Sequence, residues 1–552
     1  MSTMRPAPRT ALATVVALSL SFLLIGGSAT PQAAMRAAPR GASTITASEL
    51  RDYLTFIASD EMEGRDTPSR GLDTTAKFLA MELARLGVKP AGDNGTYFQK
   101  IALVKRTVDP TQTTARLGER TLTYGADYLT GDMPGTVEGP LVYVGHGWIV
   151  KSKNIDAYKG LDVKGKIIIA HDGMPQGVSR ADTRGKSGPD KWESPRTYAA
   201  RNGAKGVIFV PSFRTLADWE RERKRDLERG STWVEKLPRE SQLTVPSLTA
   251  SPSLVQDLFD GEKMNGADVF KHAVDRDTVD PFELTAKKQM RFTVVSKTAA
   301  LSTQNVVGKI EGSDPKLKEE YIALGAHYDH VGIGTPNAAG DAIYNGADDD
   351  GSGTTAVLAI AKAFSEAGAP PKRSILFVWH CGEEKGLWGS DYYTTFPTIP
   401  LERVITQLNI DMIGRTRIAT DTKPEDANLT GPDEIYVIGS RMMSTDLGDL
   451  SERVNKSQLN LKFNYKYDDP TDSERFFFRS DHYNYARKGV PIIFYFDGVH
   501  EDYHRPSDSV DKIDFDKMEK VTRTIYATAV ALTDLPARPR VDKALAKELT
   551  EQ

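Results

Sequence analysis

The stretch of residues 321–353 constrains the fold of this chain more than any other, because it places acidic and imidazole side chains directly after a strand. Residues 321–324 are apolar and β-branched, as in a buried strand, and the chain then runs through His327 and Asp329. Ligands of open α/β sheets collect at the carboxyl edge of the strands. The adjacent carboxylates at 348–350 repel one another unless water or a cation neutralises them. The stretch indicates a cation site at such an edge, although 348–350 alone could be a plain turn.

Beyond residue 305, predicted strands alternate with predicted helices, which is typical of a mainly parallel sheet with helices on both faces. Two further helices are predicted nearer the N-terminus, the first after a capping box at 46–49. The loop at 63–66 between them could lie close to a functional site or simply join the two helices, and we favour the second interpretation. The sequence therefore predicts an α/β fold with a mainly parallel, mixed sheet. The expected strands are 321–324, 374–380, 405–410 and 490–496, and the expected helices are 46–57, 73–86, 354–364 and 514–532.

Composition points to a globular chain without a nucleic-acid partner. The 552 residues allow two or three domains, and the net charge of −4 comes without any long basic run. Arg5 and Arg9 precede an apolar run at 11–25, so residues 1–29 are predicted to be a signal peptide of an exported, periplasmic or secreted protein. After cleavage we expect no stable membrane association; an uncleaved anchor is the alternative. Residues 30–44 are predicted to be a disordered leader.

From about residue 139 the sequence changes to short strands separated by turns. The segments VKGKIIIAHDG, YAARNGAKGVIFV and TVPSLTAS resemble the protease-associated domain that is inserted in several peptidase families. This resemblance covers residues 135–285 and implies a smaller, β-rich α/β domain there. Its histidines, His146, His171 and His272, are scattered and are predicted to be structural. The remaining chain then divides into a main domain at 45–134 and 286–535 and a flexible tail at 536–552.

Later segments repeat the pattern of polar side chains at the ends of strands. One predicted strand is followed by Glu383 and Glu384, of which one can bind a metal while the other takes a proton from water. Another strand ends in Asp411, and a late turn holds His504. Imidazole and carboxylate side chains from separated loops are a ligand set that zinc accepts.

The ordered segments GAHYDH, GADDDGSG, CGEEKGLWGS, LNIDMIG, RSDH and DYHRPSD resemble the co-catalytic di-zinc metallopeptidases, which include bacterial leucyl aminopeptidases, aminopeptidase Y and glutamate carboxypeptidase II. The resemblance covers residues 46–130 and 300–535 and implies the zinc exopeptidase fold. It implies two Zn²⁺ ions, one held by His327 and Asp411 and the other by Glu384 and His504, with Asp349 shared between them. It also implies a cis peptide bond after Asp349.

The same resemblance implies roles for three further side chains. Glu383 would be the general base, Asp329 would orient His327, and Tyr503 would donate a hydrogen bond to the developing oxyanion. His330 could be a third histidine near the metals, but both His330 and His380 are predicted to belong to the fold or to support the ligands instead.

Other side chains near these motifs are predicted to shape the pocket or to belong to the core. His482 is predicted to support the wall of the substrate pocket rather than to bind metal. The run at 476–478 could line that pocket or belong to the core, and we favour the pocket. The only cysteine, Cys381, cannot form an intrachain disulfide and is predicted to be inert rather than a nucleophile.

The resemblance predicts a zinc-dependent aminopeptidase that removes N-terminal residues from peptide substrates by means of a two-metal activated water. A carboxypeptidase or dipeptidase on the same scaffold is the alternative, and it would need an arginine for the substrate carboxylate, such as Arg415 or Arg505. In the carboxypeptidase branch proline commonly follows the shared aspartate, whereas Asp350 stands here, which favours an aminopeptidase. A non-catalytic binding protein and a single-zinc glutaminyl cyclase are disfavoured because all five ligands and the base are present.

Overall fold

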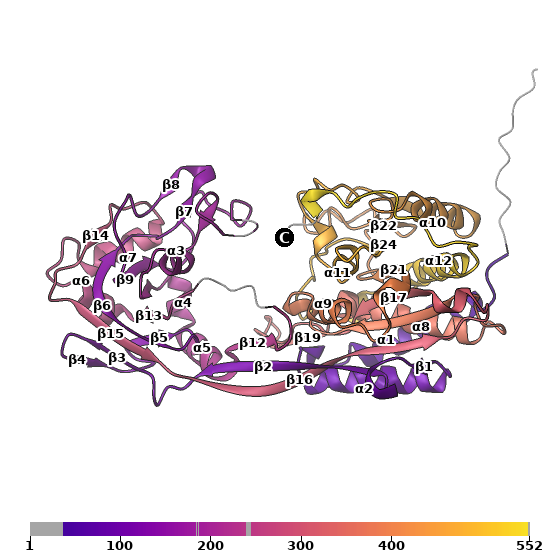
Figure 1. The fold of residues 1–552 in the computed structure, drawn as a ribbon, viewed down its shortest axis with the longest axis horizontal. Helices are drawn as coiled ribbons and strands as arrows, with labels where there is room; N and C mark the ends of the chain where they lie inside the picture. Colours follow the sequence, from indigo (N-terminus) through magenta and orange to yellow (C-terminus); the bar gives the residue numbers. More distant parts are fainter. Residues whose placement is uncertain (1–36, 184, 186, 239–243, 550–552) are drawn as a thin grey trace, which may run out of the picture.

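Figure 1 shows the computed structural model as two lobes that are joined by a pair of long strands. The structure describes residues 37–549 except 184, 186 and 239–243. The expected signal peptide and the first part of the expected leader lie outside these residues. Within the described range, no helix has the length and apolar character that a membrane crossing requires.

The larger lobe is built on a mixed sheet whose four central strands are parallel. Antiparallel strands extend the sheet on both sides, so it is less parallel than predicted. Its order is β12 (Ser231–Val234), β2 (Phe98–Val108), β16 (Ser296–Ile310), β20 (Ser374–His380), β17 (Tyr321–His327), β21 (Val404–Ile410), β24 (Ile492–Phe496), β22 (Glu434–Ile438) and β23 (Lys462–Asn464), and β1 (Lys89–Pro90) pairs with β16.

Helices cover both faces of this sheet, as predicted. Alternate residues of β17 enter two different cores, with Ile322 and Leu324 on one face and Ala323 on the other. Because both faces are buried, the central strands are continuous apolar runs. The first face carries α1 (Ala47–Ile57), α2 (Arg70–Arg85), α8 (Gly353–Ser365), α10 (Thr445–Ser457) and α12 (Phe515–Thr533), and the second carries α9 (Trp388–Thr395) and α11 (His482–Ala486).

The smaller lobe has its own sheet and cores. Its sheet extends beyond the expected insert at both ends, because three of its strands precede residue 135 and one follows residue 285. Helix α3 (Pro195–Arg201) packs on one face, and α6 (Pro252–Phe259) and α7 (Gly266–Asp275) pack on the other. The order is β4 (Arg120–Leu122), β3 (Thr114–Leu117), β15 (Gln289–Val294), β6 (Gly135–Tyr143), β9 (Ile167–His171), β11 (Gly206–Val210), β13 (Ser247–Ala250) and β5 (Tyr128–Thr130), with β14 (Phe282–Glu283) on β6.

The charged segment after residue 212 connects the two lobes. It forms α4 (Phe213–Ala217) and α5 (Trp219–Lys224), and β12 then joins the edge of the larger sheet. The Arg221 and Arg229 guanidinium groups donate to Thr335 Oγ1 (3.4 Å) and to the Ile333 carbonyl (3.2 Å). The segment around these two acceptors contains β18 (Gly332–Ile333), which pairs with β19 (Ile343–Tyr344).

Both ends of the described chain are packed, so residues 37–44 of the expected leader and 536–549 of the expected tail are more ordered than predicted. Ala42 is buried, and the Tyr526 hydroxyl donates to the Arg40 carbonyl. At the other end, Arg540 pairs with Asp446 and Leu549 is buried in the core. Side-chain pairing and one apolar anchor therefore hold segments whose composition alone indicates disorder.

Candidate metal centre

The carboxyl ends of the central parallel strands bring the predicted polar side chains together. His327 is the last residue of β17 and pairs in register with His380 at the end of β20. Glu383 and Glu384 follow β20, and Asp411 follows β21 directly. Because neighbouring parallel strands end at one edge, side chains far apart in sequence meet there.

The three adjacent aspartates at 348–350 have different partners. The Asp350 carboxylate accepts the backbone N–H groups of His327 (3.1 Å) and Met412 (3.2 Å), and Asp348 accepts that of Gly414 (2.7 Å). These two carboxylates tie β17 and the end of β21 to the turn. The bond between Asp349 and Asp350 is cis, as predicted, and Asp349 faces the histidines.

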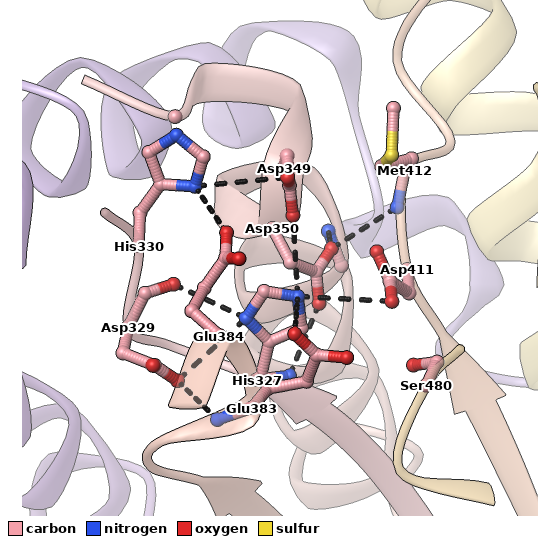
Figure 2. Close-up of polar contacts among 12 residues, drawn as sticks. His327, Asp329, His330, Asp349, Asp350, Glu383, Glu384, Asp411, Met412 and Ser480 are labelled. Atoms are coloured by element: carbon pink, nitrogen blue, oxygen red, sulfur yellow. Dashed lines mark hydrogen bonds and ion pairs between the residues drawn. The ribbon is translucent and has the colours of Figure 1, made fainter. Parts of the chain in front are cut away.

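A first group of candidate ligand atoms surrounds His327 Nε2 (Figure 2). This atom lies 3.2 Å from Asp349 Oδ1, 3.7 Å from Asp411 Oδ2 and 3.9 Å from Glu383 Oε2. The other ring nitrogen, Nδ1, lies 3.1 Å from the backbone carbonyl oxygen of Asp329. A histidine held by its second nitrogen in this way presents Nε2 to a metal.

A second group consists of His330, Asp349, Glu384 and His504. His504 Nε2 lies 3.1 Å from Asp349 Oδ2 and 3.0 Å from Glu384 Oε1. His330 Nδ1 lies 2.9 Å from the same Glu384 oxygen. The two oxygens of Asp349 therefore face different groups, and this carboxylate is common to both.

The donor set fits divalent cations. Asp349 Oδ2, Glu384 Oε1, His330 Nδ1 and His504 Nε2 are buried without a hydrogen-bond partner, although they lie close to one another. Buried polar atoms in folded proteins nearly always have a hydrogen-bond partner. Four buried atoms that lack one and lie close together therefore fit a bound cation. Nitrogen and carboxylate oxygen are donors that zinc accepts.

Electrostatics agree with a site built for positive charge. Burial raises the pKa of Asp349, but His327, His330 and His504 outweigh this effect and hold it well below its usual range. Burial raises the pKa of Glu383 well above its usual range, Glu384 adds to the rise, and His327 opposes it. Asp349 is thus the fixed anion of the cluster, whereas Glu383 takes a proton more readily than an ordinary carboxyl group does.

Asp329 and Tyr503 lie where they were expected, but Asp329 acts through different atoms. Its carboxylate is 3.7 Å from His327 Nδ1, which is longer than the 3.1 Å contact of its carbonyl, and it accepts the backbone N–H of Glu383 at 3.1 Å. Tyr503 stacks on His504 at 3.9 Å between ring centroids. Burial and then the charge of Asp349 raise its pKa well above the usual range, so its hydroxyl keeps its proton.

Arg65 supports the candidate site, and the sequence interpretation missed it because it favoured a plain connecting role for its loop. Its fully buried guanidinium donates to the carbonyls of Tyr328 (3.0 Å) and Gly346 (2.9 Å), which flank the two ligand-bearing loops. It also donates to the Ile57 and Asn345 carbonyls, both at 2.7 Å. The 63–66 loop therefore supports the site instead of merely joining two helices. A buried charge with four carbonyl partners was not readable from a short polar loop.

Asp508 supports the same turn from the opposite side and was also missed. Its carboxylate accepts the backbone N–H groups of Asp348 and Asp349, each at 3.1 Å. It belongs to the DYHRPSD segment, so a signal was present in the motif, but no role followed from residue type alone.

The first group faces a small pocket that is open to solvent. Phe476 lines it, whereas Phe477 and Phe478 lie in the core, so the prediction for this run holds for one ring of three. His482 stacks on the lining residue Phe494 at 4.4 Å and supports the wall as predicted. The lining consists of His327, Asp349, Glu383, Asp411, Met412, Phe476, Arg479, Phe494, Phe496, Val499 and Tyr503.

The remaining candidates are parts of the fold. His380 Nε2 lies 3.1 Å from the Tyr485 hydroxyl, and burial raises the pKa of the Cys381 thiol, which keeps it protonated. In the smaller lobe, His171 contacts the Tyr143 hydroxyl at 2.6 Å and His272 contacts Asp277 at 2.8 Å. The described part of that lobe holds no compact cluster of potential metal ligands.

Comparison with known proteins shows what this chain is similar to. The family model of peptidase family M28 matches residues 305–529. The chain is 27% identical over 290 residues to leucine aminopeptidase 2 of Arthroderma otae, covering 47% of this chain and 51% of that protein. It is 28% identical over 257 residues to a probable leucine aminopeptidase of the same organism, covering 42% and 63%. The chain spans about half the length of the first of these relatives.

Among solved structures, an aminopeptidase from Aneurinibacillus sp. strain AM-1 matches with a TM-score of 0.51 at 18% identity, covering 91% of this chain and 97% of that one. At this identity the likeness concerns the fold, and it confirms the predicted α/β class. The family match contains all five predicted ligands, from His327 to His504. Residues 305–529 of the chain are therefore similar to peptidase family M28.

Proposed function

We propose that this protein is an exported di-zinc aminopeptidase that removes N-terminal residues from peptides. The observation that carries the proposal is the shared position of Asp349, whose two oxygens face two separate groups of buried ligand atoms. Two cations close together need a shared anionic ligand to offset their repulsion. In this proposal His327 and Asp411 hold one ion, Glu384 and His504 hold the other, and Asp349 is shared.

When bound, two zinc ions would polarise the scissile carbonyl and lower the pKa of a water molecule at the site. Glu383, with its raised pKa, accepts the proton of the attacking water and passes it to the leaving amine. Tyr503, which stays protonated, donates its hydrogen bond to the oxygen on which negative charge develops. Asp329 holds the backbone of Glu383 in place.

The pocket supports an apolar N-terminal side chain as the substrate group. Met412, Phe496 and Val499 line it beside the acidic wall formed by Glu383 and Asp411. Such a wall attracts a free α-amino group while the apolar side holds the side chain. The leucine aminopeptidases named above are relatives with an activity of this class.

A mixture of short peptides with free or blocked ends tests the proposal. The purified protein should remove residues one at a time from free N-termini only, and a chelator should abolish this. Glu383→Gln should lower kcat by about 10² to 10⁴-fold while zinc content is retained, because only the proton transfer is lost. Release of residues from the C-terminus would show that the protein is a carboxypeptidase and not an aminopeptidase. The absence of any cleavage in the presence of zinc would refute the proposed peptidase activity.

Arg479 favours a dipeptidase or carboxypeptidase as the second candidate. Arg415 cannot serve as predicted, because it is buried and bonded to Asp502 (2.9 Å) and His500 (3.1 Å). Arg505 is exposed and does not line the pocket. The Arg479 guanidinium does line it, stacks over Phe476 at 4.7 Å, and has no carboxylate partner among the described residues. A free cation beside the site suits the carboxylate of a short peptide.

Arg479→Gln distinguishes the two candidates. If Arg479 binds a terminal carboxylate, the variant raises KM for dipeptides but leaves KM for the matching amides unchanged. Arg475→Gln is the matched control, since its guanidinium also stacks on a phenylalanine, Phe478, but does not line the pocket. An equal change in KM for dipeptides and for their amides would exclude the second candidate and leave only the aminopeptidase.

Export and the identity of the smaller lobe are further parts of the proposal. The basic and apolar N-terminal pattern supports a signal peptide that is cut after Ala29, and the mass of the secreted protein tests this. The three motifs quoted above support a protease-associated domain in the smaller lobe.

A further inference from the structure

We propose that His330 is a fourth protein ligand of the second metal position, which makes the two positions unequal. The proposal rests on the proposed di-zinc function. It concerns a residue for which the sequence favoured a role in the fold or in supporting the ligands over a place in the metal site. Figure 2 shows its ring directed at Asp349 and Glu384.

The contacts of His330 are those of a ligand rather than of a hydrogen-bonded histidine. Its Nδ1 atom lies 2.9 Å from Glu384 Oε1 and 3.7 Å from Asp349 Oδ2, and it makes no hydrogen bond to either. His504 Nε2, a ligand in the proposed function, shows the same pattern with the same two oxygens. The four atoms lie within 4.8 Å of one another. Short separations without hydrogen-bond alignment mean that these atoms face a common point.

The backbone fixes the orientation of the His330 ring. Gly346, at φ 57°, lies so close that an added Cβ would be 2.5 Å from His330 Cγ. The His330 N–H donates to the Arg65 carbonyl at 3.2 Å, and its ring meets that of His504 edge to face at 5.4 Å. The ring is therefore held in place although neither of its nitrogens makes a hydrogen bond. Preorganisation of this kind is what a metal ligand requires.

His482 shows what a histidine of the fold looks like in this protein. It is equally buried and both of its nitrogens also have no hydrogen-bond partner. Its ring, however, stacks on Phe494 and meets Phe477, so it fills an aromatic core. His330 instead faces two carboxylates. Burial and the lack of hydrogen bonds are common to both residues, and only the surroundings separate them.

The consequence is an asymmetric pair of positions. The second position would have four protein ligands, His330, Asp349, Glu384 and His504, which is the closed set of a structural zinc site. The first would have three, His327, Asp349 and Asp411, and so keeps room for a further ligand beside Glu383. We infer that the second ion is retained and the first exchanges.

Metal content after exhaustive chelation and reloading with zinc tests this inference in the full-length protein. Elemental analysis should give two ions per wild-type chain, and calorimetric titration with ZnCl₂ should resolve a tight and a weaker step. His330→Ala should weaken the tight step at least ~10-fold, the size of effect seen for partners of metal ligands. His482→Ala, which removes the same atoms from an equally buried site, should leave both steps unchanged.

Two further variants separate ligation from folding. His330→Cys keeps a metal-binding atom and should retain the tight step, whereas His330→Gln, which nearly preserves the volume, should lose it; circular dichroism checks the fold of each. Unchanged zinc affinity in His330→Ala would overturn the inference alone. A wild-type protein that binds no zinc would overturn the proposed function with it.

Discussion

A single buried guanidinium, that of Arg65, connects the segments that carry the two halves of the site. Its carbonyl partners belong to the end of α1, to the residue after β17 and to the two residues before the aspartate-rich turn. Burial lowers the pKa of Arg65 to about 10, and the charges of Asp329 and Asp508 oppose that effect, so it stays protonated at neutral pH. The positive charge of Arg65 faces these carboxylates, and its N–H groups donate to four backbone carbonyls.

Arg65→Lys should therefore be strongly destabilising despite the retained charge. An ammonium group cannot reach four carbonyls, and buried unpaired acceptors cost about 1–3 kcal/mol each. We expect the free energy of unfolding of the larger lobe to fall by about 3 kcal/mol, and zinc to bind more weakly. Thermal unfolding and zinc titration measure the two effects. Arg70→Lys, at the exposed start of α2, is the control, and equal behaviour of the two variants would contradict the role given to Arg65.

His482 makes the larger lobe sensitive to acid. Burial lowers its pKa to about 3 in the folded protein, against about 6.5 in an unfolded chain. Between these values the unfolded chain binds a proton that the folded chain does not, so stability falls as the pH falls through this window. His482→Phe keeps the stack on Phe494 and removes the titrating group.

The variant should lose about 2 kcal/mol less stability than the wild type between pH 7.5 and pH 5. Denaturant unfolding at the two pH values gives the comparison. Phe478→Leu, a change in the same core without a titrating group, should keep the wild-type pH dependence. An unaltered slope in His482→Phe would show that this histidine is not the source.

The individual proposed ligands were predictable because each stands in a short motif, at or soon after the end of a strand for His327, Glu384 and Asp411 and in a turn for Asp349 and His504. Arg65 was not, because its partners at Tyr328, Asn345 and Gly346 are more than 260 residues away in sequence. The carbonyl of Asp329 was also not predictable as the group nearest His327 Nδ1, because residue type says nothing about backbone direction.

Among the elements, the start of α8 is packed so closely that one methyl group should disturb the site. An added Cβ at Gly353 would lie 2.2 Å from the Ile410 carbonyl and 2.4 Å from Asp350 Oδ1. Ile410 precedes the proposed ligand Asp411, and Asp350 holds the backbone of His327. The helix can therefore approach β21 only with glycine at this position.

Gly353→Ala should lower the free energy of unfolding by about 1–3 kcal/mol, as overpacking does, and weaken zinc binding at the first position. Gly431→Ala is the matched control, because an added Cβ there meets nothing within 4 Å. Thermal unfolding with and without zinc checks both. The packing argument fails if the two variants behave alike.

Element boundaries were predictable where apolar spacing is regular, as in α12, and less so elsewhere. Helix α2 begins three residues before its predicted start, because the Ser69 hydroxyl accepts the N–H of Leu72 and caps it. Strand β16 was not predicted. Its first half is mostly exposed and polar, and it is held by pairing with β2 instead of by burial.

For the molecule as a whole, the smaller lobe approaches the site through its charged segment. Arg221 and Arg229 contact the segment that follows the His330 loop (Figure 1). We expect this lobe to limit access of long peptides. Val108 and Ser296 are direct partners in β2 and β16, so residues 109–295 can be replaced by an Asn-Gly hairpin turn.

The shortened protein should bind zinc and raise the kcat/KM ratio of a decapeptide to a dipeptide amide by about 10-fold, which corresponds to 1.4 kcal/mol of lost discrimination. Peptide hydrolysis followed by mass spectrometry measures the ratio. Because β12 is lost, β2 becomes an edge strand, and light scattering must first show a monodisperse sample. A ratio equal to that of the full chain would exclude the smaller lobe from substrate selection.

The pairing of β2 with β16 also has a consequence for the order in which this protein acquires its structure. During synthesis the first two helices must wait for the chain beyond residue 296 before the larger sheet can form. The smaller lobe can fold in the meantime, and it holds its own ends together through the Asp109 N–H and the Val295 carbonyl, 2.8 Å apart. Because this contact already holds the two ends together, pairing β2 with β16 carries most of its loop-closure entropy cost in the folding of the smaller lobe. Folding of the smaller lobe would thus bring β2 and β16 together in register before the larger sheet, which carries the metal centre, is complete.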